Sequence, residues 1–242
     1  MGSGPRLVAQ RPPLRRIRWT ATYRIVSDRY PPIAAFERIA DAADLAALDE
    51  LERFTDPAQR QQAGRISLVP KERRVFGRGA SAAMAPFVHA STANPSRFTD
   101  GSYGIYYAGR AFETALAEVA FHRARFHAAT GDPPLQATFL THVAPLDASL
   151  HDIRGDGFAR YLKPDLASYP AAQAFAARLR GAGSNGLVYP SVRHATGECL
   201  AAFWPDVIGR PKPGKRLALK WDGRTIVAWF DFETERWSDL TP

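Results

Sequence analysis

Apolar positions along the chain follow two spacings, and each spacing predicts a different kind of element. Short runs rich in valine, isoleucine and aromatic residues, bounded by glycine or proline, predict strands. Longer stretches in which apolar residues recur every three or four positions predict helices. Strands are expected at residues 18–26, 65–70, 104–108, 135–143, 186–189 and 199–207 and in a hairpin of 216–221 and 225–232, and helices at 33–40, 45–54, 112–129 and 170–180, with a helical turn at 82–86 and a loop at 145–168. Short strands dispersed among helices predict an α+β fold, a mixed β core with flanking helices, rather than a regular βαβ array.

Turn and cap residues mark several of these boundaries. Asp222-Gly223 is a strong signal for a tight hairpin turn. Gly131, followed by Asp-Pro-Pro, is expected to end the helix that begins near Phe112. Pro170 at the start and Gly181 at the end of the next helix follow the usual asymmetry of helix termini.

Chemistry-bearing residues gather in the stretch 94–126. Arg97 lies in a turn-rich segment, and the short strand after it carries Tyr106 and Tyr107. Because side chains alternate along a strand, one of these tyrosines is expected in the core and the other in a pocket. Glu118 follows in the second turn of a helix that is apolar on nearly every side, where a carboxylate needs a partner or a ligand. A cation, an aromatic face and a carboxylate this close together predict a site for an anionic ligand with an aromatic head.

Composition narrows the class of protein. A chain of 242 residues with 45% hydrophobic residues favours one globular domain, or two small ones at most. Cys199 is the single cysteine, which excludes an intramolecular disulfide and fits a reducing compartment. No apolar run approaches the roughly 18 residues of a membrane span, and no secretory signal is recognisable. We therefore expect a soluble, cytoplasmic protein.

Positive charge is concentrated at the N-terminus. Residues 1–24 contain six arginines and no acidic residue, whereas the chain as a whole has a net charge of +8. The chain is therefore divided into a basic arm at 1–18 and a single domain at 19–242. The arm is interpreted first as a solvated terminus, and contact with nucleic acid or another acidic partner is the alternative.

Three other kinds of site receive little support. Gly77-Arg78-Gly79-Ala80-Ser81-Ala82 has the form of a dinucleotide fingerprint, but no apolar strand precedes it. The histidines are scattered and lack clustered partners, so no metal site is expected. The chain has no nucleophile-elbow motif of a serine hydrolase. Ser191 does follow a strand, in a position from which its hydroxyl could face a pocket.

Five short motifs together resemble the RES domain, the toxin half of bacterial toxin–antitoxin modules whose antitoxin is an Xre-type helix-turn-helix protein. The spacing from Arg24 to Arg97 is longer than in compact members, which implies a helical insertion at about 31–64 and resembles the ParT-like branch. Arg97 is followed by Phe-Thr, where many members have Trp-Asn. The motifs are Tyr23-Arg24, Ser96-Arg97-Phe98, Tyr106-Tyr107, Thr114-Ala115-Leu116-Ala117-Glu118 and Tyr189-Pro190-Ser191-Val192-Arg193.

The resemblance implies a fold, a substrate and a set of roles. The fold would be similar to ADP-ribosyltransferases of the diphtheria-toxin class, with NAD as the substrate and no metal. Arg97, Tyr107 and Glu118 would take the arginine, tyrosine and glutamate places of that active site, and Arg24 and Ser191 would be further pocket residues that bind NAD.

The implied activity is growth arrest by a toxin that transfers ADP-ribose to a cellular protein, for which phosphoribosyl pyrophosphate synthetase is a candidate. NAD degradation, as a glycohydrolase or a phosphorylase, is the alternative, and a non-catalytic partner of an Xre-type regulator is another. The implied assembly is a hetero-oligomer with the antitoxin, without direct contact with nucleic acid or membrane.

Overall fold

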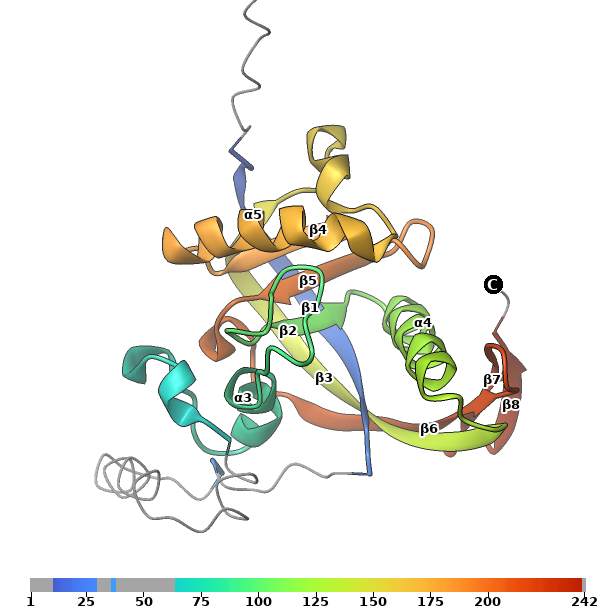
Figure 1. The fold of residues 1–242 in the computed structure, drawn as a ribbon. Helices are drawn as coiled ribbons and strands as arrows, with labels where there is room; N and C mark the ends of the chain where they lie inside the picture. The colour runs from blue at the N-terminus through green and yellow to red at the C-terminus, as the bar shows by residue number, and fades with distance from the viewer. Residues whose placement is uncertain (1–10, 30–35, 38–63, 241–242) are drawn as a thin grey trace, which may run out of the picture.

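The computed structural model describes residues 11–29, 36–37 and 64–240 of the chain (Figure 1). Helices are interspersed irregularly among strands that form a mainly antiparallel sheet, which confirms the expected α+β class. In chain order the elements are β1 (Leu14–Ser27), η1 (Ile66–Leu68), η2 (Lys71–Arg73), α3 (Ala80–Val88), β2 (Tyr106–Gly109), α4 (Phe112–Thr130), β3 (Leu135–Asp152), η3 (Asp156–Tyr161), η4 (Leu166–Ser168), α5 (Tyr169–Gly181), β4 (Gly186–Pro190), β5 (Glu198–Ala202), η5 (Pro205–Val207), β6 (Lys212–Trp221), β7 (Ile226–Asp231) and β8 (Arg236–Asp239).

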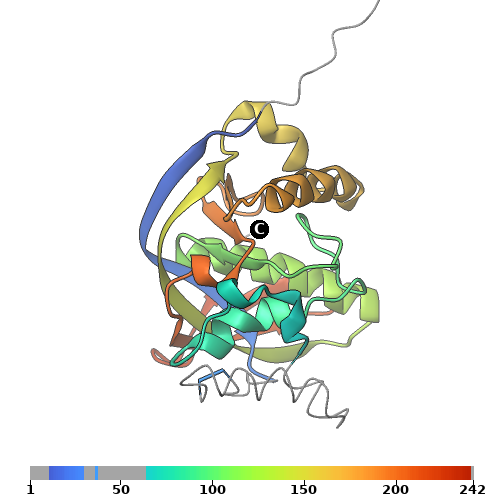
Figure 2. The same ribbon diagram turned by 90° about the vertical axis from the view of Figure 1, so that its left-hand side faces the viewer.

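Eight strands of the described residues form one sheet, and five of them pair in a closed circuit. The pairings run β1–β2–β5–β4–β3, and β1 also pairs with β3, which completes the circuit. Strands β6, β7 and β8 continue the sheet outward from β3. All of these pairs are antiparallel except β3–β4. Figure 2 shows β1 and β3 as a long, curved pair along one side of the molecule, with α3, α4 and α5 on the other side.

Each long helix covers its own apolar cluster. Met84 and Phe87 of α3 pack in the cluster that includes Tyr106, and Phe175 of α5 packs in a second cluster over β4 and β5. Leu116 of α4 belongs to a third cluster, formed with β3, β6 and β7. Helix α4 thus lies beside the sheet and contacts β1 and β2, so one of its faces borders the junction of these two strands.

Helix α4 is the element that the sequence predicts best. It begins at Phe112 and ends at Thr130, within one residue of the expected limits. Gly131 takes the left-handed conformation, with φ +66°, and closes the helix as its C-cap. The hairpin of β6 and β7 is also confirmed, and the N–H of Asp222 donates to the carbonyl of Thr225 across its turn.

Two strand predictions are wrong for local physical reasons. Residues 65–70 form short 3₁₀ turns rather than a strand. Their buried residues, Ile66 and Val69, are three positions apart, which fits a 3₁₀ turn and not the alternation of a strand. The expected strand at 199–207 ends at Ala202, and Pro205 begins the 3₁₀ turn η5 that follows.

The loop expected at 145–168 is also wrong in its first part, because β3 continues to Asp152. Proline cannot donate to a β ladder, so a strand can include Pro145 only where no ladder hydrogen bond is needed from it. In the structure Pro145 lies opposite a register shift in β1, between Trp19 and Thr22, where a ladder hydrogen bond is not required. The short strand β8, which no sequence pattern predicted, completes the sheet beside β7.

At the N-terminus, β1 begins at Leu14, so residues 14–18 of the expected basic arm lie in the sheet. The helices expected at 33–40 and 45–54, and with them the insertion at 31–64, fall outside the described residues except for residues 36–37, which form a turn. Within the parts of the chain that the structure describes, no helix is long and apolar enough to cross a membrane.

Candidate active site

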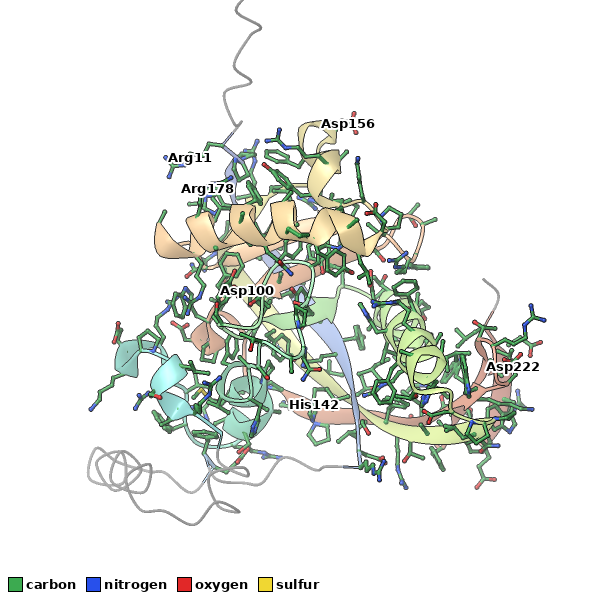
Figure 3. All side chains as sticks on the ribbon, viewed as in Figure 1. Arg11, Asp100, His142, Asp156, Arg178 and Asp222 are labelled. Atoms are coloured by element: carbon green, nitrogen blue, oxygen red, sulfur yellow. The ribbon has the colours of Figure 1, made fainter. Side chains whose placement is uncertain are left out.

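A cavity of about 360 Å³ lies where α4 borders β1 and β2, a size in the usual range for small-molecule sites. The loop between α3 and β2, which carries Asp100, lies beneath α5 on one side of this region (Figure 3). Gln173 of α5 holds that loop by donating to the backbone carbonyls of Ser96 and Thr99 at 2.9 and 3.2 Å. The residues that line the cavity include Tyr23, Arg24, Ser96, Arg97, Tyr107, Ala115, Glu118, Val119, His122, Arg123, Tyr169, Tyr189, Arg193 and Cys199.

Helix α4 contributes one continuous face to the cavity. Ala115, Glu118, Val119 and His122 all line it, and their spacing of three and four positions places them on one side of the helix. Glu118 is half-buried rather than enclosed by the apolar residues next to it in sequence. The carboxylate that the sequence predicted on this helix therefore faces the cavity.

Glu118 is held by a neutral donor. The hydroxyl of Ser191 donates to its Oε1 at 2.7 Å, and the thiol of Cys199 lies 3.9 Å from the same oxygen. No arginine, lysine or histidine of the described residues forms an ion pair with this carboxylate. The carboxylate is therefore held in one orientation while its negative charge is not neutralised. A group that stabilises a developing cation needs both properties.

Ser191 is placed by the tight loop between β4 and β5. Its hydroxyl oxygen accepts the backbone N–H groups of Arg193 and His194, each at 3.1 Å. The loop is tied to α4 a second time by His194 Nδ1 and Thr114 Oγ1, which lie 3.0 Å apart. Ser191 is not among the residues that line the cavity. The geometry thus supports a role in positioning Glu118 and gives no direct support to the expected contact with a ligand.

The two adjacent tyrosines of β2 divide as the strand pattern predicts. Tyr106 is fully buried in the core, and its hydroxyl has no hydrogen-bond partner among the residues that the structure describes. Tyr107 lines the cavity. Its hydroxyl lies 2.8 Å from Ser96 Oγ and accepts the N–H of Phe98 at 3.2 Å. Tyr107 thereby fixes the segment on either side of Arg97 as well as offering a ring face.

Arg97 is buried, with 8% of its surface exposed, although an isolated arginine would be expected at the surface. Its Nη1 donates to the carbonyl of Lys163 at 2.6 Å, and its guanidinium lies 4.9 Å from the ring centroid of Tyr169. These contacts fix the guanidinium without neutralising it, because no described carboxylate pairs with it.

Arg24, from β1, is the second cation of the predicted set. Its Nη1 donates to the backbone carbonyl of Tyr107 at 3.1 Å, and its guanidinium lies 5.0 Å from the ring centroid of Tyr106. Burial lowers the pKa of this guanidinium, which nonetheless keeps its charge at neutral pH. The structure therefore brings Arg24, Arg97, Tyr107 and Glu118 to one cavity, from three separate elements and a loop.

Sequence reasoning missed several residues of this cavity. Arg193 belongs to the Tyr-Pro-Ser-x-Arg motif but was not assigned a role, and its guanidinium stacks on Phe121 at 3.4 Å. Arg123 lies four positions after Val119, which also lines the cavity, so helical spacing could have placed Arg123 near the site. Tyr169 and Tyr189 come from α5 and β4, far along the chain, and no local pattern connects them to α4.

The charges of the cavity are strongly unbalanced. Among the residues that the structure describes, four arginines and one carboxylate line it. Such an enclosed cationic surface attracts anionic ligands and binds phosphate oxygens through charge-assisted hydrogen bonds. The described residues contain no group of three or more histidine, cysteine or acidic side chains placed to hold a metal ion.

The model of the RES domain family matches residues 71–222, more than half of the chain. The chain belongs to the RES domain family. The matched part of this RES domain protein contains Arg97, Tyr107, Glu118 and Ser191, whereas Arg24 precedes it.

Individual relatives are more distant. The uncharacterized protein y4oC of Sinorhizobium fredii (strain NBRC 101917 / NGR234) is 26% identical over 218 residues, which cover 87% of each protein. Among solved structures, the crystal structure of the M. tuberculosis MbcT–MbcA toxin–antitoxin complex matches 86% of the RES domain chain and 87% of the other chain, with a TM-score of 0.39 and 12% identity.

Proposed function

We propose that this RES domain protein cleaves NAD at the bond between nicotinamide and ribose, and that it acts as the toxin of a toxin–antitoxin module. The observation that carries the proposal is Glu118, an oriented carboxylate without an ion-pair partner among the described residues, in a cavity whose lining includes four arginines and four tyrosines. NAD has a negatively charged pyrophosphate, aromatic rings and a ribose that becomes cationic during cleavage. These three features match the three kinds of side chain in the cavity.

Binding would divide between the cations and the aromatic rings. Arg97 and Arg24 would hold the pyrophosphate, for which the planar guanidinium fork is well suited. Tyr107 would stack on the nicotinamide ring, an offset contact that contributes about 0.5–1.5 kcal/mol beyond simple burial. Its hydroxyl is held by Ser96 and Phe98, so the ring is already positioned before a ligand arrives.

Cleavage needs one bond to break and one to form. The electron pair of the glycosidic C–N bond leaves with nicotinamide, which departs as a neutral molecule, and the ribose becomes an oxocarbenium-like cation. Glu118 would accept hydrogen bonds from the ribose hydroxyls and stabilise that cation, as carboxylates do in glycoside cleavage. A nucleophile then bonds to the anomeric carbon and releases its proton.

The nucleophile decides the biological outcome. A side chain of a cellular protein would yield an ADP-ribosylated protein, and phosphoribosyl pyrophosphate synthetase is the candidate acceptor implied by the ParT-like resemblance. Water would yield ADP-ribose, and phosphate would yield ADP-ribose phosphate, each of which depletes NAD. Either outcome arrests growth, and an Xre-type helix-turn-helix antitoxin would restrain it.

The decisive experiment is an assay of nicotinamide released when the purified chain is incubated with NAD. Glu118→Gln removes the negative charge at nearly constant volume, and we expect release to fall about a hundredfold or more. Glu113→Gln is the matched control, because Glu113 is exposed in the first turn of the same helix. That control should change release by no more than about twofold, as surface substitutions generally do. Equal release by the two variants would contradict the proposal.

Mass spectrometry of lysate proteins after induction separates transfer from degradation. An ADP-ribose adduct on one protein, absent with Glu118→Gln, supports the transferase. A collapse of cellular NAD without an adduct supports a glycohydrolase or phosphorylase. If cells stop growing while their NAD stays intact and no protein carries an ADP-ribose adduct, the chain acts as a non-catalytic partner instead.

A further inference from the structure

Arg123 differs from the other arginines of the cavity. Each of the other three is fixed by a hydrogen bond to a backbone carbonyl: Arg24 to Tyr107 at 3.1 Å, Arg97 to Lys163 at 2.6 Å and Arg193 to Pro164 at 2.7 Å. The guanidinium of Arg123 has no hydrogen bond and no ion pair with any residue that the structure describes. Within the described part of the chain, all of its N–H groups are therefore available to a ligand.

Ring contacts hold Arg123 in the cavity wall without using its donors. Its guanidinium carbon lies 5.2 Å from the ring centroid of Phe139 and 5.8 Å from that of Phe126. The side chain is half-buried, and burial lowers the pKa of the guanidinium. A partly desolvated cation without a counter-charge is unfavourable, and an anion bound beside it would remove that cost.

Helical geometry separates Arg123 from the Arg97 side of the cavity. Phe121, on which Arg193 stacks, and Arg123 are two positions apart in α4 and so point about 200° from each other around the helix axis. The cavity-lining face of Glu118 and His122 lies between them. Guanidinium groups therefore lie on both sides of the carboxylate.

The surroundings of His122 are consistent with this distribution of charge. The side chain of His122 is in contact with solvent, and partial desolvation together with the positive charges of Arg125, Arg193, Arg97 and Arg123 lowers its pKa below the ordinary value. The imidazole is consequently neutral at physiological pH and adds no further cation to this crowded face. It also supplies no negative charge to Arg123.

We propose that Arg123 forms a second phosphate subsite, on the side of α4 opposite the one on which Arg193 stacks. This subsite makes the cavity selective for a ligand with a diphosphate. Its free fork can bind two oxygens of one phosphate, while the Arg97 side binds the other. The naming of that ligand as NAD rests on the proposed function. The subsite itself rests on the unpaired guanidinium and its place in the cavity wall.

The test is the affinity for inorganic pyrophosphate, measured by isothermal titration calorimetry on the full chain. Arg123→Gln should weaken binding about tenfold or more, and Arg123→Lys, which keeps the charge but not the fork, should give an intermediate loss. Arg178→Gln is the matched control, because Arg178 is exposed on α5, does not line the cavity and its loss changes the net charge equally. It should leave affinity within about twofold of the unmodified chain. Circular dichroism confirms that each variant is folded.

Two results would overturn the inference: unchanged pyrophosphate affinity in Arg123→Gln, or an equal loss in Arg178→Gln. A chain that does not bind pyrophosphate at all would also overturn it. The assay of nicotinamide release is independent. If pyrophosphate affinity depends on Arg123 but no nicotinamide is released from NAD, the proposed reaction is refuted and the phosphate subsite is supported. If Arg123→Gln releases nicotinamide with an unaltered KM for NAD, the phosphate subsite is refuted and the proposed reaction is supported.

Discussion

The hydroxyl of Ser191 donates to Oε1 of Glu118 at 2.7 Å while its oxygen accepts two backbone N–H groups of its own loop. One side chain thus joins the carboxylate on α4 to the turn between β4 and β5. A carboxylate on a helix can adopt several rotamers, and this contact selects the one that faces the cavity. Ser191 therefore acts through Glu118, and its loss should be visible in the chemical step.

We expect Ser191→Ala to lower kcat more than it changes KM. A hydrogen bond to a charged group contributes about 1.5–3 kcal/mol, which corresponds to roughly a ten- to hundredfold change in rate. Both constants follow from nicotinamide release at varied NAD concentration. Ser191→Thr keeps the hydroxyl and should recover most of the rate, and Ser102→Ala, at an exposed serine, is the control. A normal kcat in Ser191→Ala would show that Glu118 is oriented without this contact.

Removing each hydroxyl of the tyrosine pair should have opposite effects on stability. Tyr106→Phe deletes a fully buried hydroxyl that has no partner, so the free energy of unfolding should stay constant or rise by about 1 kcal/mol. Tyr107→Phe deletes the contacts with Ser96 and the N–H of Phe98, so it should lower stability by about 1–3 kcal/mol. Urea unfolding of the two variants gives both values.

The same pair separates folding from function. Tyr106→Phe should retain the NAD-cleaving rate, because Tyr106 does not line the cavity. Tyr107→Phe keeps the stacking ring but releases the segment that carries Arg97, so it should be partly active and Tyr107→Ala less active still. Equal rates for Tyr107→Phe and Tyr107→Ala would contradict the stacking role of the ring.

The sequence predicts those elements whose signals are local. Helix α4 has an apolar run with a glycine stop, and the β6–β7 hairpin has its Asp-Gly turn, and both were placed correctly. The continuation of β3 past Pro145 was missed because the compensating register shift lies in β1, more than a hundred residues earlier. Tertiary pairing overrides a local strand breaker there, and a local pattern has no access to it.

The candidate site divides in the same way. Glu118 could be found from its place on an apolar helix, and strand alternation indicated that one of Tyr106 and Tyr107 faces a pocket. The resemblance to the RES domain selected Tyr107. The burial of Arg97 could not, because it depends on the carbonyl of Lys163 and the ring of Tyr169, which belong to a later segment. The role of Ser191 likewise depends on a contact between β4–β5 and α4. Long-range packing converts side chains that are ordinary in sequence into a single cavity.

Arg97 should prove necessary for both stability and activity. Arg97→Ala leaves the carbonyl of Lys163 without its donor and a cavity beside Tyr169, which we expect to lower stability by about 1–3 kcal/mol. For a chain of this size each kcal/mol shifts Tm by about 2–4 °C. Arg97→Lys keeps the positive charge, so it should recover part of the stability but little activity, since a lysine cannot reproduce the fork. A fully active Arg97→Lys would show that the site needs only the positive charge of Arg97 and not its planar fork.

His142 should make the stability of the fold dependent on pH. His142, labelled in Figure 3, lies on β3 and is 5% exposed. It pairs with Arg24 of β1 in the sheet, and its Nδ1 has no hydrogen-bond partner among the described residues. Burial, assisted by the positive charge of Arg24, lowers its pKa to about 4. The unfolded chain titrates this imidazole near its ordinary pKa of about 6.5. Between these two values the unfolded state binds the additional proton, so stability rises with pH across that window.

The contribution of His142 is therefore complete above pH 6.5 and is lost as the pH falls toward 4. The size of the shift corresponds to about 3 kcal/mol. Urea unfolding of the unmodified chain and of His142→Gln, at a series of pH values across this window, measures it. We expect the free energy of unfolding to fall more steeply with decreasing pH in the unmodified chain, because glutamine does not titrate. Parallel curves for the two proteins would mean that His142 binds its proton equally well in the folded and unfolded states. The buried imidazole would then not be a source of acid sensitivity.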